Sequence, residues 1–250
     1  PFIDGIAPDT AEYTQAVRYY ADRSEFPLFP VYTANQADQA ADAACAACSH
    51  GSNNFSNINE TLQARLFSRA IRDYPSPNIT PDMYRQMIEW QSWNEYVGGD
   101  NRFPDNNEFF FNWNPTTKTL GRSGIHHDVL GSFNWMIFED VAGLQPRLDD
   151  VVELWPIDMG FDHFAVNNLS YHGSNVTIVW QRPGGTTYYP LAPAGYSLYV
   201  DGQRAFTVDD LAHVTWDSRT GAVSVRDGSA TRVLFQTHVP VSAAHQVSLS

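Results

Sequence analysis

The sequence has few positive charges, and this excludes several classes of partner. Lys and Arg total 15 against 28 for Asp and Glu, which gives a formal net charge of −13 at pH 7. Lys118 is the single lysine. Such a surface repels phosphate backbones and anionic lipids, so we expect neither a nucleic-acid nor a membrane partner. No apolar run approaches the roughly 18 residues that cross a bilayer.

Cysteine is equally scarce: Cys45 and Cys48 are the only two, spaced Cys-x-x-Cys in an alanine-rich segment. A local disulfide, two inert thiols, half of a metal site and a redox motif are all compatible with this spacing. The lack of a second cysteine pair disfavours a metal centre. No Walker or dinucleotide-binding fingerprint occurs either. We therefore predict no metal and no cofactor.

The composition is that of a folded protein, with 43% hydrophobic and 14% aromatic residues in 250. The chain opens at Pro1 in an ordinary loop sequence without an initiator methionine. It is therefore expected to be a mature product or a piece of something longer. Asn-x-Ser/Thr sequons exceed the number expected by chance and predict a secreted, glycosylated protein; they occur at Asn54, Asn59, Asn78, Asn168 and Asn175.

Two patterns divide the chain into a helical region, 1–148, and a strand-rich region, 149–250. Helical periodicity and capping signals predict helices over 11–24, 35–48, 60–74, 81–97 and 126–142. A long polar and aromatic loop is expected over 100–124. Short β-branched or aromatic runs then predict antiparallel strands over 151–157, 162–173, 175–182, 186–192, 196–206, 212–217, 222–227 and 231–239. The expected fold class is α+β, a helical domain followed by a β-sandwich.

Candidate chemistry concentrates between residues 90 and 128, where indole rings alternate with carboxylates and amides. Indole faces stack on sugar rings, and carboxylates or amides bond their hydroxyls, so this mixture is typical of a carbohydrate cleft. The expected substrate-binding residues are Trp90, Trp93, Asn94, Trp113, His126 and His127. A packed helical core with solvated loop acids would give the same composition.

Hydrolysis of a glycosidic bond needs two carboxyl groups. Glu108 is the preferred candidate because it lies between a polar turn and the apolar 109–111 run, where partial desolvation would tune its pKa. Asp105 and Glu95 are the alternatives. The adjacent His126 and His127 point about 100° apart on a helix, so they are not expected to bind one metal ion together.

Four segments carry a family resemblance: SGIHHDVLGSFNWMIFEDVAGLQPR, DDVVELWPI, FDHFAVNNLSYHGSNVTIVW and YSLYVDGQRAF. In this order they resemble the C-terminal end of (α/α)6-barrel glycoside hydrolases. The nearest groups are the mannosylglycerate-hydrolase-like and family 63-like enzymes, with trehalases more distant. The resemblance implies the C-terminal part of a six-hairpin helical toroid followed by a small antiparallel β-sandwich.

The resemblance also implies a mechanism. The catalytic base of these enzymes is a glutamate just before a loop similar to residues 112–117, and Glu108 takes this role if a short insertion is allowed. The general acid would lie on a segment before Pro1, and the reaction would invert configuration. The expected function is therefore a secreted glycoside hydrolase, or its C-terminal part, acting on an oligo- or polysaccharide. A non-catalytic carbohydrate-binding or accessory module, and a polysaccharide lyase, are the alternatives.

Overall fold

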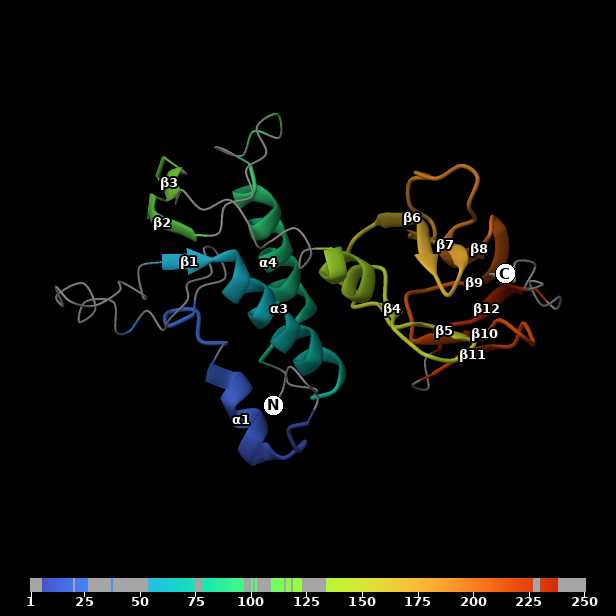
Figure 1. Ribbon diagram of the computed structural model, residues 1–250, viewed down its shortest axis with the longest axis horizontal. Coiled ribbons are helices and arrows are strands. Elements are labelled where there is room, and N and C mark those ends of the chain that lie inside the picture. The colour runs from blue at the N-terminus through green and yellow to red at the C-terminus, as the bar shows by residue number, and fades with distance from the viewer. Residues whose placement is uncertain are drawn as a thin grey trace, which may run out of the picture. The chain divides into compact units, whose positions relative to one another are not determined.

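The structure is a computed structural model that describes residues 6–19, 21–26, 37, 54–74, 78–96, 100, 102, 109–114, 116–117, 119–122, 134–226 and 230–237. The chain divides into two compact units, Pro1–Met136 and Ile137–Ser250 (Figure 1). Each unit is built on its own set of contacts.

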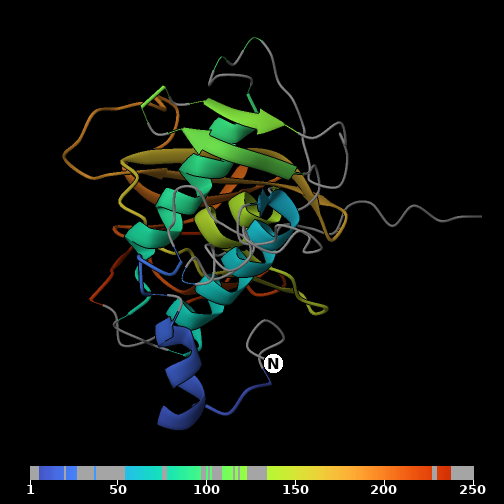
Figure 2. The same cartoon turned by 90° about the vertical axis from the view of Figure 1, so that its left-hand side faces the viewer.

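The first unit contains the helices α1 (Ala11–Tyr19), α3 (Asn57–Arg72) and α4 (Pro81–Asn94). Helix α4 begins as the sequence predicts: the Thr80 hydroxyl accepts a hydrogen bond from the Met83 N–H at 3.3 Å, and Pro81 occupies the first turn. Helices α3 and α4 pack against each other in both views (Figures 1 and 2). Their buried positions recur every three to four residues, at Ala64, Phe67, Ala70, Tyr84, Met87 and Trp90.

A three-stranded antiparallel sheet accompanies these helices, in the order β1-β2-β3. It consists of β1 (Asn54–Ser56), β2 (Phe109–Asn114) and β3 (Thr119–Arg122). The prediction of one long loop over 100–124 is therefore wrong for these strands. The aromatic run of β2 suits a pleated strand, and its partner β1 lies more than fifty positions earlier, where local sequence gives no signal. The Asn114 side chain accepts from the Thr116 and Thr117 N–H groups and shapes the β2–β3 turn.

The second unit is made of two antiparallel sheets (Figure 1). The smaller has the order β11-β10-β5-β4 and comprises β4 (Leu144–Gln145), β5 (Val151–Leu154), β10 (Val214–Asp217) and β11 (Val223–Val225). The larger has the order β12-β9-β8-β7-β6 and comprises β6 (His163–Tyr171), β7 (Ser174–Gln181), β8 (Gly195–Val200), β9 (Gln203–Val208) and β12 (Val233–Gln236).

The two sheets share one apolar core. Alternate residues of β7 point inward, and alternate residues of β5 and β10 meet them from the other sheet. Fully burying each of these side chains contributes roughly 1.5–3 kcal/mol. The inward set includes Val152, Leu154, Val176, Ile178, Trp180, Val214 and Trp216.

Two tight turns fix the register of the larger sheet. His172 and Gly173 join β6 to β7 with φ of +50° and +79°, and Asp201 and Gly202 join β8 to β9 with +47° and +79°. Two consecutive residues with positive φ define the hairpin turn whose twist matches the flanking strands. The turn predicted at Asp201–Gly202 is thereby confirmed. The segment 186–192, predicted as a strand, is an irregular loop between β7 and β8.

A short π-helix, Met136–Val141, leads into the second unit and ends before Gly143, as the glycine predicts. Gly143 has φ of +85°, and a Cβ there would lie 2.5 Å from the Pro156 nitrogen, so only glycine fits. Residues 126–133 of the predicted helix lie outside the described part.

The predicted helical toroid is wrong. In the described ranges the helices are short and form no ring of helical hairpins, and the strands form three antiparallel sheets. The toroid was implied by the family resemblance, and the described residues of the segments that carry it form the π-helix and strands β4 to β9, which contain no helical hairpin.

Candidate functional site

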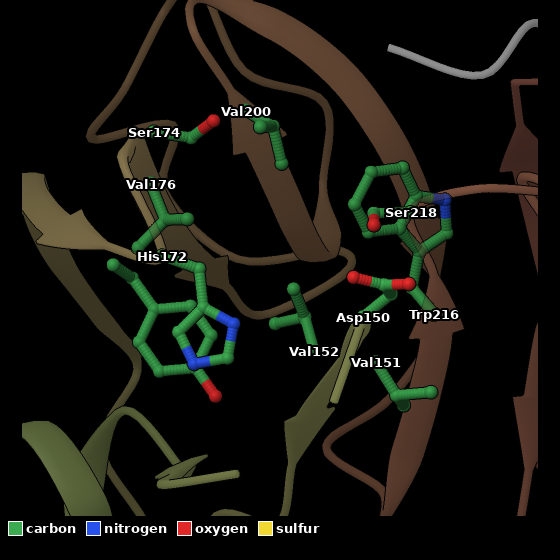
Figure 3. Close-up of a pocket in the computed structure, with 10 residues that line it drawn as sticks. Asp150, Val151, Val152, His172, Ser174, Val176, Val200, Trp216 and Ser218 are labelled. Carbon is green, nitrogen blue, oxygen red and sulfur yellow. The ribbon is translucent and has the colours of Figure 1, made fainter. Parts of the chain in front are cut away.

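A cavity of about 180 Å³ lies at one end of the two-sheet core (Figure 3). We call it the end cavity. Its lining comes from both sheets and their connecting turns: Asp150, Val151, Val152, Tyr171, His172, Ser174, Val176, Val200, Trp216 and Ser218. Figure 3 shows His172 on one side and Asp150, Ser218 and Trp216 on the other. The valines make part of the lining apolar.

One wall of the end cavity consists of two stacked rings. The His172 imidazole lies on the Tyr171 ring with centroids 4.2 Å apart and an interplanar angle of 11°. His172 Nε2 is 2.8 Å from the Arg147 carbonyl. The Tyr171 hydroxyl accepts from the Arg147 N–H at 3.1 Å and donates to the Gln145 carbonyl at 3.4 Å. Burial raises the pKa of Tyr171. Both rings are therefore oriented by the backbone of 145–147.

The opposite wall is formed around Trp216, which is fully buried. Its indole N–H has no hydrogen-bond acceptor among the described residues, and Figure 3 shows this nitrogen on the side away from His172. The Asp150 carbonyl accepts the Ser218 N–H at 3.0 Å, which ties the two rim segments together. The rim thus offers a carboxylate and a hydroxyl next to the indole.

An ion-pair network adjoins the stacked rings through Arg147. Its guanidinium contacts Asp149 at 2.5 Å and Glu153 at 2.5 Å, and Glu153 also contacts His213 Nε2 at 2.6 Å. Hydrogen bonds to Asp149 and Glu153 raise the pKa of Arg147, and the same contact with Arg147 lowers the pKa of Asp149 to about 2. Partial burial alone would raise the pKa of Glu153, but hydrogen bonds from Arg147 and His213 outweigh it and lower that pKa. His213 stacks on Trp155 at 4.2 Å.

The end cavity combines an apolar floor, aromatic rings and a polar rim. This combination suits a small cyclic ligand with one apolar face and several hydroxyl groups. Its volume is below the roughly 300–1,000 Å³ typical of drug-sized ligands, so it accommodates about one ring. Asp150 is the single carboxylate in the described lining. Hydrolysis of a glycosidic bond needs a second carboxyl group beside it.

The residues predicted for catalysis are only partly described. Glu108, Asp105, His126 and His127 lie outside the described residues, as do Cys45 and Cys48. Glu95 caps the C-terminus of α4, where its N–H donates to the Gln91 carbonyl at 3.3 Å. The pairing of Glu95 with Asp105 or Glu108 therefore stays a prediction.

The predicted sugar-binding aromatics lie on two elements of the first unit. Trp90 is fully buried in α4 and stacks on Trp93 with ring centroids 5.5 Å apart. Asn94 is the last residue of α4, and Trp113 lies in β2. A sugar ring needs an exposed aromatic face, which Trp90 does not offer in this packing. Their role in substrate binding stays a prediction.

The sequons occupy different environments. Asn168 and Asn175 are exposed on β6 and β7 of the larger sheet, whereas Asn78 is half-buried in the turn before α4. Asn54 lies in β1 and Asn59 in α3. Asn168 has φ of +56° at a bulge, and its N–H donates to the Thr177 hydroxyl at 3.1 Å.

The sequence pattern predicts functional groups in 90–128 and gives no indication of the end cavity. Its lining residues come from segments that are up to seventy positions apart, so no local pattern groups them. The His172–Gly173 dipeptide is the one available signal, since it marks a tight turn that carries a ring side chain to the end of a sheet.

Among the described residues, no helix is long and apolar enough to traverse a lipid bilayer. In the same part of the chain, His, Cys, Asp and Glu side chains form no group of three or more that could hold a metal ion.

Comparison with known proteins gives a likeness in fold. No protein-family model matches the sequence. A solved structure named a sialidase superposes with a TM-score of 0.68 and 21% sequence identity over 86% of this chain. The chain corresponds to only 20% of the length of that sialidase. The shared feature is the fold, and it is not that of a helical toroid.

Proposed function

We propose that this chain is a saccharide-binding part of a longer carbohydrate-active protein, and that the end cavity holds one sugar ring. The observation that carries this proposal is the lining: Val152, Val176 and Val200 make it partly apolar, and Val152 lies between His172 and Asp150. The fold is similar to a region that makes up 20% of a solved sialidase chain, and this supports a role as an accessory part of a larger protein. The saccharide that supplies this ring would be an oligo- or polysaccharide.

Electrostatics favour a neutral saccharide as the ligand. The net charge of −13 and the carboxylate of Asp150 at the rim both oppose an anionic sugar. A carboxylate is instead a strong acceptor for sugar hydroxyls, and the Ser174 and Ser218 hydroxyls can both donate and accept.

The test is binding by the whole chain to an array of neutral and sialylated oligosaccharides, followed by titration calorimetry with the best ligand. Asp150→Asn keeps the shape of the side chain and removes its charge, so we expect at least a tenfold loss of affinity. The matched control is Asp210→Asn, beyond the opposite end of β9, which should bind within about twofold of wild type. Equal affinities for the two variants, or no binding to any oligosaccharide, would contradict the proposal.

Bond cleavage is a separate proposal that rests on the sequence. Glu108 would activate a water molecule, with its acid partner elsewhere in the protein. Glu108→Gln should lower turnover by several orders of magnitude while substrate still binds. Retained activity would remove Glu108 as the base.

We also propose that the protein is secreted and glycosylated, which the exposure of Asn168 and Asn175 supports. Expression in a eukaryotic secretory host followed by intact-mass measurement tests this. The mass should fall after deglycosylation, and an unchanged mass would refute it.

A further inference from the structure

The loop between β7 and β8, residues 182–194, is held from inside by one side chain. Gln181 at the end of β7 is 2% exposed. Its Oε1 accepts from the Tyr188 and Tyr189 N–H groups at 3.2 and 3.1 Å. Its Nε2 donates to the carbonyls of Tyr189, Ala192 and Pro193 at 3.2, 2.6 and 3.1 Å. A loop tied this way has a fixed shape before any ligand arrives, which lowers the ordering cost of binding.

The anchored loop presents an aromatic ring to solvent. The Tyr188 ring stacks on His163 with centroids 3.5 Å apart and an interplanar angle of 14°. Tyr189 meets the same imidazole at a tilt, 5.8 Å away. Tyr188 is nevertheless 44% exposed. Because His163 covers one face of the Tyr188 ring, only the other face can take a ligand ring. We call Tyr188, its support His163 and Leu191 of the same loop the Tyr188 platform.

The surroundings of the platform favour a sugar over a protein partner. On this loop the exposed large apolar side chains are Tyr188 and Leu191, too few for the patch of several hundred Å² that marks a protein interface. Thr186 and Thr187 are exposed beside them, and Arg182 pairs with Asp162 at 2.9 Å close by. A single flat ring with hydroxyls and a neutralised charge pair around it fits the C–H face and polar rim of a pyranose.

The platform is separate from the end cavity. His163 begins β6 and Gln181 ends β7, whereas Tyr171 and Ser174, which line the cavity, are at the other ends of these strands. Eight residues of strand at about 3.3 Å each place the two sites roughly 26 Å apart. A change at one site therefore leaves the other intact.

We propose that the Tyr188 platform is a second saccharide contact, on which a neutral pyranose ring of an oligosaccharide stacks. It rests on the proposed function for its ligand class but uses different residues. Two contacts on one rigid unit would let a saccharide chain bind more tightly than either contact alone.

The test compares Tyr188→Ala with Tyr188→Phe in the whole chain, using the same oligosaccharide array and calorimetry. The alanine variant should lose at least tenfold in affinity for the best oligosaccharide. The phenylalanine variant keeps the ring and should stay within about threefold. Thermal unfolding of both variants checks that the fold is retained.

The possible outcomes separate this inference from the proposed function. If Tyr188→Ala binds like wild type while Asp150→Asn is weakened, the platform is refuted and the end cavity stands. If Tyr188→Ala is weakened and Asp150→Asn is not, the platform is supported and the cavity fails. If wild type binds no oligosaccharide on the array, both are refuted.

Discussion

The two ends of β6 and β7 present aromatic rings in different ways. At one end, the Tyr171–His172 pair lines the end cavity and is oriented by backbone groups of 145–147. At the other, Tyr188 is displayed on an exposed loop that the Gln181 side chain holds. A cavity lined by several polar groups can distinguish the hydroxyl pattern of a ligand, whereas a single exposed ring offers only stacking. The comparison indicates a selective site and a general one on the same sheet.

Breaking the loop anchor should have the largest effect. Gln181→Leu keeps a side chain of similar size at this buried position but removes the hydrogen bonds of Oε1 and Nε2, leaving backbone N–H and carbonyl groups of the loop without this partner. We expect the free energy of unfolding to fall by about 2–4 kcal/mol. Urea denaturation measures it. Gln203→Leu, at an exposed position of β9, should change it by less than about 0.5 kcal/mol; equal effects would show that Gln181 is not an anchor.

Removing the His172 imidazole from the end cavity should have an intermediate effect on ligand affinity and little effect on the free energy of unfolding. His172→Asn preserves the positive φ of the turn, since asparagine tolerates this conformation and Asn-Gly favours the turn type. The variant loses the ring that lines the cavity and its contact with the Arg147 carbonyl. We expect about a tenfold lower affinity for the best oligosaccharide. The free energy of unfolding should stay within about 1 kcal/mol of wild type. Unaltered affinity would place the ligand elsewhere.

The smallest expected effect is on acid stability. The folded pKa of Asp149 is about 2, against its ordinary value of 3.8, and that of Glu153 is also lowered. The unfolded chain therefore binds more protons in this range, so the two carboxylates stabilise the fold above their ordinary pKa values. This contribution is lost as the pH falls from about 4.5 to about 2. Because the pairs are partly exposed, salt should weaken the effect.

Replacing Arg147, which pairs with both Asp149 and Glu153, isolates their contribution to acid stability. Arg147→Gln should flatten the pH dependence of the melting temperature between about pH 4.5 and 2. Arg182→Gln removes the exposed pair with Asp162 at the other end of the sheet and should leave the slope near that of wild type. An unchanged slope in Arg147→Gln would contradict the assignment of the lowered carboxylate pKa values to Arg147.

The features predicted from sequence are those with local signals. Thr80 and Pro81 begin α4 because capping uses neighbouring backbone groups, and the Asp201–Gly202 turn follows from the need for positive φ. Strand β2 was missed because its pairing depends on Asn54–Ser56, far along the chain. The resemblance to toroidal hydrolases gave the wrong architecture, because most of the segments that carry it are strands of the second unit and contain no information on how the helices are arranged.

The candidate sites depend even more on tertiary structure. Asp150, His172 and Ser218 meet only after the two sheets pack, so their sequence neighbours give no indication of a cavity. Gln181 reads as an ordinary strand end, and its five bonds to 188–193 appear only once the loop closes over it. The five sequons, by contrast, are visible in sequence, and their occupancy stays a prediction.

The most direct test of the central claim is a crystal structure of the chain with its best neutral oligosaccharide bound. The account predicts one sugar ring in the end cavity, against Val152, Val176 and Val200, with hydroxyl groups within hydrogen-bond distance of Asp150 or His172. An empty end cavity, with the oligosaccharide bound among residues 90–128 instead, would contradict it.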